Sequence, residues 1–136
     1  MGAINRAARH FDCGDYFTDL RRRIRYRTES QDPDALGVLH DYLQQEIAPA
    51  VRRLGCEWRI VTNPVESAGP VLIAHRHESD SATTVLIYGH GDVVPGQEMF
   101  WRPGLSPWDL VMEGDRWYGR GSADNKGQHS INLAAL

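Results

Sequence analysis

The feature that most constrains this chain is an apolar run at residues 85–88, Val-Leu-Ile-Tyr, that leads directly into Gly-His-Gly-Asp at residues 89–92. A continuous β-rich run of this kind is typical of a strand that is covered on both faces. A strand that ends here places an imidazole and a carboxylate on a rigid loop, and the glycines leave space beside the ring. The run therefore predicts polar chemistry at the end of a buried strand.

A second glycine-rich segment carries another carboxylate. Residues 118–127 read Tyr-Gly-Arg-Gly-Ser-Ala-Asp-Asn-Lys-Gly, and a helix is predicted from residue 126. Asp124 fits either the N-cap of that helix or a metal ligand, because a carboxylate has two oxygens and can bridge two ions. His90 fits a zinc ligand, and Asp92 is placed to hold the other ring nitrogen. The two segments together predict half of a metal site.

Two amphipathic helices are predicted ahead of the strands. Apolar residues at helical spacing predict the first over residues 15–27, and the arginines within it are interpreted as its solvated face. Asp32 followed by Pro33 is a typical start for the second. An apolar stripe then continues for about five turns, and Pro49 is expected to kink or break the helix near residues 45–46.

Strands are predicted over residues 56–61, 71–74 and 85–88. The first alternates and should be half-buried, whereas the other two are continuous apolar runs that we expect to be covered on both faces and joined as a hairpin. Residues 67–70 predict a turn, and residues 109–118 predict a hairpin that leads into the second motif. Helices, then strands, then a helix indicate an α/β fold in which helices flank a mixed β-sheet.

Two groups of residues are assigned no chemistry of their own. His75, His77 and His129 join no motif and are expected on the surface or on a helix face. Residues 100–108 are rich in aromatic residues and proline, which fits a packed loop that covers the end of the sheet. The same segment also fits a wall of an active-site cleft, and the sequence leaves both interpretations open.

Composition narrows the classes of partner. With 136 residues the chain suits one domain, and a net charge of −3 gives no reason to expect a nucleic-acid or membrane surface. The first residues lack the apolar core of a secretory signal, and no apolar run approaches the ~20 residues that cross a bilayer. Cys13 and Cys56 form no framework and are expected as free thiols. These features predict a cytoplasmic protein with neither nucleic acid nor membrane as partner.

The two motifs, at residues 88–95 and 118–127, resemble the N-terminal signatures of the zinc-dependent aminoacylase and carboxypeptidase family. That family includes acetylornithine deacetylase, succinyl-diaminopimelate desuccinylase, glutamate carboxypeptidase and the cytosolic dipeptidases. Trp101 and the segment around it, between the motifs, also match. The resemblance implies an enzyme that hydrolyses an amide or peptide bond beside a free carboxylate, and hence a small peptide or an N-acyl amino acid as substrate.

The resemblance also implies roles for individual residues. His90 ligates one zinc ion, Asp124 bridges two zinc ions, and Asp92 is the catalytic acidic residue behind His90; cobalt or manganese would suit the same ligand types. A cis peptide bond between Asp124 and Asn125 is implied as well. Which acyl group or peptide is cleaved is left open, because specificity comes from cleft and lid residues.

The family pattern continues beyond what this sequence contains. A Glu-Glu pair, a further acidic ligand and a late histidine are expected after Asp124, and the sequence ends at Leu136. We therefore expect residues 1–136 to be the N-terminal part of a zinc-peptidase-like catalytic domain, without its C-terminal half and without the lid domain that allows homodimers. Such a chain should bind zinc weakly and be inactive alone. The alternative is a non-catalytic α/β remnant that acts as a binding or interaction module.

Overall fold

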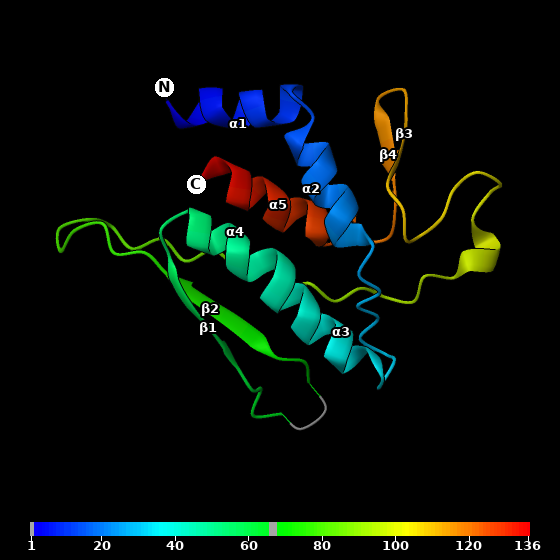
Figure 1. Cartoon of the computed structure of the whole chain (residues 1–136), viewed down its shortest axis with the longest axis horizontal. Coiled ribbons are helices and arrows are strands. Elements are labelled where there is room, and N and C mark those ends of the chain that lie inside the picture. The colour runs from blue at the N-terminus through cyan, green and yellow to red at the C-terminus, as the bar shows by residue number, and fades with distance from the viewer. Residues whose placement is uncertain (1, 66–67) are drawn as a thin grey trace.

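The computed structural model describes residues 2–65 and 68–136 and has a mixed α/β architecture, which confirms the predicted fold class (Figure 1). The strands pair as two antiparallel hairpins, β1 with β2 and β3 with β4. The elements in chain order are α1 (Ala3–Asp12), α2 (Asp15–Ile24), α3 (Ala35–Tyr42), the π-helical turn η1 (Leu43–Ile47), α4 (Ala48–Arg53), β1 (Glu57–Val61), β2 (Val71–His75), the 3-10 turn η2 (Glu98–Phe100), β3 (Val111–Glu113), β4 (Arg116–Tyr118) and α5 (Lys126–Ala135).

The core lies where α2 crosses the C-terminal part of the chain. Tyr16, Leu20 and Ile24 form one stripe of α2 and pack with Leu110, so the apolar spacing that predicts this helix is also what buries it. The helix ends at Ile24 rather than at the predicted residue 27, and α1, which contacts both α2 and α5, was not predicted. In Figure 1, α5 lies between α2 and α4.

The interpretation of the arginines of α2 as a solvated face is wrong for Arg23. Its side chain is 2% exposed, and its Nη1 donates to Ser130 Oγ on α5 at 2.6 Å. Arg21 makes two 2.8 Å bonds to the carboxylate of Asp109. Arg23 lies seven residues after Tyr16 and three after Leu20, so helical spacing places it on the buried face of α2 beside them. The error came from treating the arginines as one solvated group. These arginines connect α2 to its neighbours.

The predicted kink in the second helix is confirmed. Helices α3 and α4 are joined through η1, whose five residues replace the regular α-helical ladder just ahead of Pro49. The start lies later than predicted, at Ala35. Asp32 instead closes a turn, where its Oδ1 accepts the N–H of Asp34 at 3.0 Å. The helix ends as predicted at Gly55, whose φ of 80° suits glycine.

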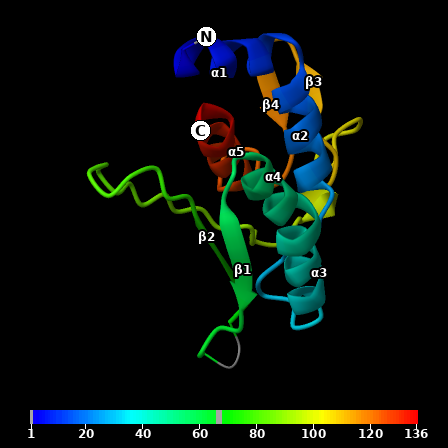
Figure 2. The same ribbon diagram turned by 60° about the vertical axis from the view of Figure 1, so that its left-hand side comes forward.

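The strand predictions are only partly right. Hairpin β1–β2 lies beside α4 (Figure 2), but β2 is not covered on both faces, since Val71 and Ile73 remain 42% and 45% exposed. Residues 85–88 form no strand and no hairpin with β2; Leu86 is 93% exposed. β-Propensity expresses packing against neighbouring strands, and among the described residues no strand pairs with this run. The predicted turn at 67–70 begins at Ser67, outside the described residues.

The remaining sequence predictions about helices, strands and cysteines are confirmed. Strands β3 and β4 form the expected hairpin, and α5 begins at Lys126. The packed-loop interpretation of residues 100–108 holds only in part: Trp108 is 7% exposed and donates its Nε1–H to Glu98 at 2.6 Å, whereas Phe100 is 77% exposed. Cys13 and Cys56 are free thiols. Over residues 2–65 and 68–136, none of the helices has the length and apolarity needed to cross a membrane.

Candidate metal centre

The structure brings the three predicted site residues together. His90 Nδ1 lies 3.0 Å from Asp92 Oδ1, and His90 Nε2 lies 3.0 Å from Asp124 Oδ1. The two motifs therefore meet at one imidazole, although 34 positions separate His90 from Asp124. Asp124 is preceded by the Gly-rich turn and followed by α5, and the peptide bond from Asp124 to Asn125 is cis, as the resemblance implies.

A carboxylate oxygen lies beside each ring nitrogen of His90, and this arrangement favours a cation between His90 and Asp124. A neutral imidazole has one N–H and one lone pair, and a carboxylate has only lone pairs. When Nδ1–H donates to Asp92, the lone pair of Nε2 faces the lone pairs of Asp124 across 3.0 Å. Two electron-pair donors at that distance need a proton or a metal ion between them. Two ligand atoms bound to the same zinc ion at about 2.0–2.1 Å lie roughly 3–3.4 Å apart, so the donor set fits zinc.

The alternative role for Asp124, as a helix N-cap, is not what the structure shows. Asn125 stands at the N-cap position of α5, and no side chain caps the helix. The Asp124 side chain is 86% exposed, whereas that of His90 is 32% exposed. Among residues 2–65 and 68–136, no group of three or more His, Cys, Asp or Glu side chains is arranged to hold a metal ion. Within the described part of the chain, the candidate donors are thus the pair formed by His90 and Asp124, and their binding of a metal stays a prediction.

The loop that carries His90 is held by residues that the sequence analysis missed. The backbone N–H of His90 donates to Asn125 Oδ1 at 3.1 Å, so the residue after Asp124 fixes the start of the loop. Thr28, which is 1% exposed, donates its hydroxyl to the carbonyl of Gly91 at 2.5 Å. Asn125 could have been suspected because it belongs to the second motif. Nothing in the sequence distinguishes Thr28.

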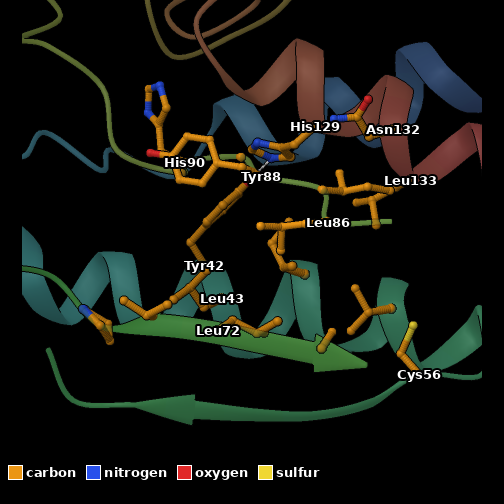
Figure 3. A pocket seen from close by; sticks show the side chains of 18 of the residues that line it. Tyr42, Leu43, Cys56, Leu72, Leu86, Tyr88, His90, His129, Asn132 and Leu133 are labelled. Atoms are coloured by element: carbon orange, nitrogen blue, oxygen red, sulfur yellow. Dashed lines mark hydrogen bonds between the residues drawn. The ribbon is translucent and has the colours of Figure 1, made fainter. Parts of the chain in front are cut away.

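His129 is buried, which contradicts a surface position although it does lie on a helix face. It is 9% exposed and hydrogen-bonds through Nε2 with the hydroxyl of Tyr42, which is 0% exposed. Figure 3 shows Tyr42 rising from the α3 side toward His129, with His90 close by. Burial, and then the charges of Arg23 and Lys126, lower the pKa of His129 to about 3. Burial raises the pKa of Tyr42 above its usual value, so both side chains are neutral at neutral pH.

Lys126 enters α5 as predicted, but its side chain is fully buried. Its Nζ donates to the carbonyl of Arg23 at 3.1 Å and to that of Tyr26 at 2.7 Å, at the C-terminal end of α2. Cationic groups are favoured at such a helix end. Burial lowers the pKa of Lys126 to about 7, against the opposing effect of Asp92. Through these bonds, Lys126 connects the second motif to the C-terminal end of α2.

An apolar groove of about 850 Å³ adjoins the centre (Figure 3). It lies between residues 82–92 on one side and β2 with the α3–α4 helix on the other, and His90 and Asp92 belong to its lining. The exposed run at residues 85–88 forms one wall. The candidate metal centre thus opens onto an apolar groove.

Comparison with known proteins points to peptidases. Residues 86–136 match the model of peptidase family M20/M25/M40. A cysteinylglycine-S-conjugate dipeptidase of Corynebacterium striatum is 32% identical over 121 residues, 88% of this chain and 26% of that protein. Among solved structures, human carnosine dipeptidase 1 matches 98% of this chain and 30% of its own with a TM-score of 0.82 and 26% identity. The di-peptidase Dug1p of Saccharomyces cerevisiae matches 98% of this chain and 31% of its own, with a TM-score of 0.78 and 25% identity. The chain spans about a quarter to a third of these relatives.

Proposed function

Because this chain belongs to peptidase family M20/M25/M40, we propose that it supplies one part of the metal centre of a zinc-dependent amide or peptide bond hydrolase, of the dipeptidase type. The observation that carries the proposal is the convergence of His90 Nε2 and Asp124 Oδ1 at 3.0 Å. We propose small peptides or N-acyl amino acids as substrates, consistent with the dipeptidases that the chain resembles.

Each of the three site residues has a distinct proposed task. His90 would hold one zinc ion through Nε2, and Asp124 would supply its carboxylate as the ligand shared between two ions. Asp92 accepts the Nδ1 proton of His90, which fixes the tautomer and ring orientation and makes Nε2 the better ligand. When bound, zinc supplies Lewis acidity toward the carbonyl group and the water of the hydrolysis; cobalt or manganese suits the same ligands.

We propose that residues 1–136 act as the N-terminal part of a larger catalytic domain. In support, the relatives match nearly the whole chain but only with 26–31% of their own length. Structural zinc sites take four ligands and catalytic sites at least three from the protein, so His90 and Asp124 alone should bind zinc weakly and give no turnover. A homodimer of the intact enzyme and a cytoplasmic location, in keeping with two free thiols, belong to the same proposal.

Zinc titration calorimetry tests the proposal. We expect the chain to bind zinc no more tightly than micromolar, and His90→Ala or Asp124→Ala to weaken binding by at least tenfold, since each removes half of the donor pair. The matched control is His40→Ala, because the side chain of His40 is 53% exposed and does not line the groove beside the centre. Equal binding by all three variants would refute the assignment. Sub-micromolar affinity, or dipeptide hydrolysis by this chain alone, would refute the two-ligand argument.

A second candidate is a non-catalytic interaction module. The observation in its favour is the exposed apolar run, in which Val85, Leu86 and Tyr88 are 74%, 93% and 78% exposed. This candidate requires no metal. It gains support if the wild-type chain shows no zinc binding in the calorimeter while residues 85–88 are protected in a complex with another protein.

A further inference from the structure

We infer that Tyr42 and His129 form a buried platform that positions the His90 loop, so that both are positioning residues of the proposed metal centre. The inference deepens the proposed function and rests on it for the metal. Neither residue lies in the motif that contains His90, and neither touches the candidate donor atoms. They come from two different elements, α3 and α5, and meet under the loop through the bond between the Tyr42 hydroxyl and His129 Nε2.

The two glycines beside His90 rest on the two members of this platform. A Cβ added to Gly89 would lie 2.6 Å from His129 Cβ, and a Cβ added to Gly91 would lie 2.5 Å from Tyr42 Cε1. Real Cβ atoms do not approach other heavy atoms so closely. The loop backbone therefore packs directly against the Cβ of His129 and the ring of Tyr42, and a side chain at residue 89 or 91 would push it away from them. This is a second reason for the glycines, beyond space for a ligand.

A hydrogen-bond chain connects the platform to His90 itself. The Tyr42 hydroxyl can donate to His129 Nε2 only when that nitrogen carries no proton, which places the ring proton on Nδ1. The His90 backbone raises the pKa of His129 against the larger effect of burial, which is the effect of a carbonyl that accepts a hydrogen from the ring. From the other side, Asn125 Oδ1 accepts the N–H of His90 at 3.1 Å. The Tyr42 hydroxyl thus sets the His129 tautomer that can hold the His90 carbonyl.

The test uses the whole chain and four variants. Tyr42→Phe removes only the hydroxyl and keeps the ring under Gly91. His129→Leu removes both hydrogen bonds, and His129→Gln restores one amide donor. Tyr26→Phe is the matched control, because the Tyr26 ring centroid lies 5.6 Å from that of Tyr42 but its hydroxyl donates to Gln45 on the exposed surface and not to His129. Exchange of the His90 amide hydrogen is followed by NMR without metal, and zinc affinity is measured by calorimetry.

We expect the His90 amide to exchange about tenfold faster in Tyr42→Phe and in His129→Leu, and zinc affinity to fall by about tenfold, as for other supporting partners of metal ligands. His129→Gln should recover part of both losses, and Tyr26→Phe should stay within about twofold of the wild type. Exchange of core amides such as those of Leu20 and Ile24 serves as the folding check. If a variant also loses the protection of these core amides, it is misfolded and is set aside. The conclusion then rests on Tyr42→Phe, which makes the smallest change to the core.

The outcomes separate this inference from the proposed function. Unchanged His90 exchange and unchanged zinc affinity in Tyr42→Phe, with zinc bound by the wild type, would overturn the platform and leave the metal assignment standing. Absence of zinc binding by the wild type would overturn the metal assignment. In that case the exchange measurement alone still decides whether Tyr42 and His129 hold the loop.

Discussion

Residues 85–88 and residues 89–93 follow each other in the chain and are held in opposite ways. The apolar run is exposed, with Leu86 at 93% and Tyr88 at 78%, and it belongs to no described strand. The polar loop after it receives contacts from Thr28, Tyr42 and Asn125, among others, and ends at Val93, which is 3% exposed and pairs with Glu29. From hydrophobicity alone, residues 85–88 would be expected to be buried and the polar loop at residues 89–93 to be exposed.

The difference shows that, in the described part of the chain, contacts from distant residues hold the polar loop and not the apolar run. The partners of the loop lie far away in sequence, on the segment after α2, on α3 and at the start of α5, so they act only once those elements have packed together. A candidate ligand held in this way keeps its position without help from a neighbouring strand. Apolar residues, by contrast, are stabilised only by what covers them, and the described residues leave this run largely uncovered.

The largest effect that tests this contrast is expected for Gly91→Ala. The new methyl group would lie 2.5 Å from Cε1 and 2.7 Å from Cδ1 of Tyr42, a side chain that is completely buried and cannot swing away. Overpacking of this kind costs about 3 kcal/mol of unfolding free energy, near the upper end of its usual range. Urea denaturation followed by fluorescence measures the loss. Zinc affinity should fall with it, because His90 is displaced.

The control for this substitution is Gly37→Ala in α3. An added Cβ there meets nothing within 4 Å. Alanine is favoured over glycine inside a helix, so stability should rise by about 0.5–1 kcal/mol. If Gly91→Ala were as harmless as Gly37→Ala, the loop would not be seated on Tyr42, and the contrast between the two stretches would disappear.

A somewhat smaller effect is expected from acid. In the folded chain His129 takes up a proton only near pH 3, whereas in the unfolded chain it does so near its usual pKa of 6.5. Between these values the unfolded state binds more protons, so the free energy of unfolding falls as the pH falls, by about 2 kcal/mol between pH 7 and pH 5. The difference between wild type and His129→Gln over this interval isolates the contribution. Parallel stability curves for the two proteins would contradict it.

The sequence predicted the donor pair better than its surroundings. The two motifs and the family they resemble predicted that His90, Asp92 and Asp124 act together, and the structure brings these residues together. The roles of these side chains toward a metal stay predictions. Tyr42 was not singled out and His129 was given no role, because an aromatic residue in a helix and a lone histidine carry no local signal. They matter through a contact between two distant elements.

The sequence predicted the features of the fold that depend on residues close together in the chain. It missed those that depend on packing between distant elements. The kink ahead of Pro49 and the turn at Gly55 follow from backbone chemistry within a few residues, and both are confirmed. The pairing of Arg23 with Ser130 depends on which helix packs where, which periodicity does not contain. The prediction of a buried strand at residues 85–88 failed for the same reason: the run has the composition of a covered strand, but composition does not supply the cover.

The smallest effect on stability is expected for Leu86→Ser, which tests the exposed run at residues 85–88 instead of the loop that follows it. A side chain that is 93% exposed loses almost no burial when it is replaced, so the free energy of unfolding should change by less than about 0.5 kcal/mol. Leu110→Ala, at a residue that is 1% exposed, should cost about 2–5 kcal/mol in the same urea titration. Light scattering should show less self-association for Leu86→Ser, because the substitution interrupts an exposed apolar run that favours association between chains. A loss of stability near that of Leu110→Ala would mean that Leu86 is covered in solution, and residues 85–88 would then be held as firmly as the loop that follows them.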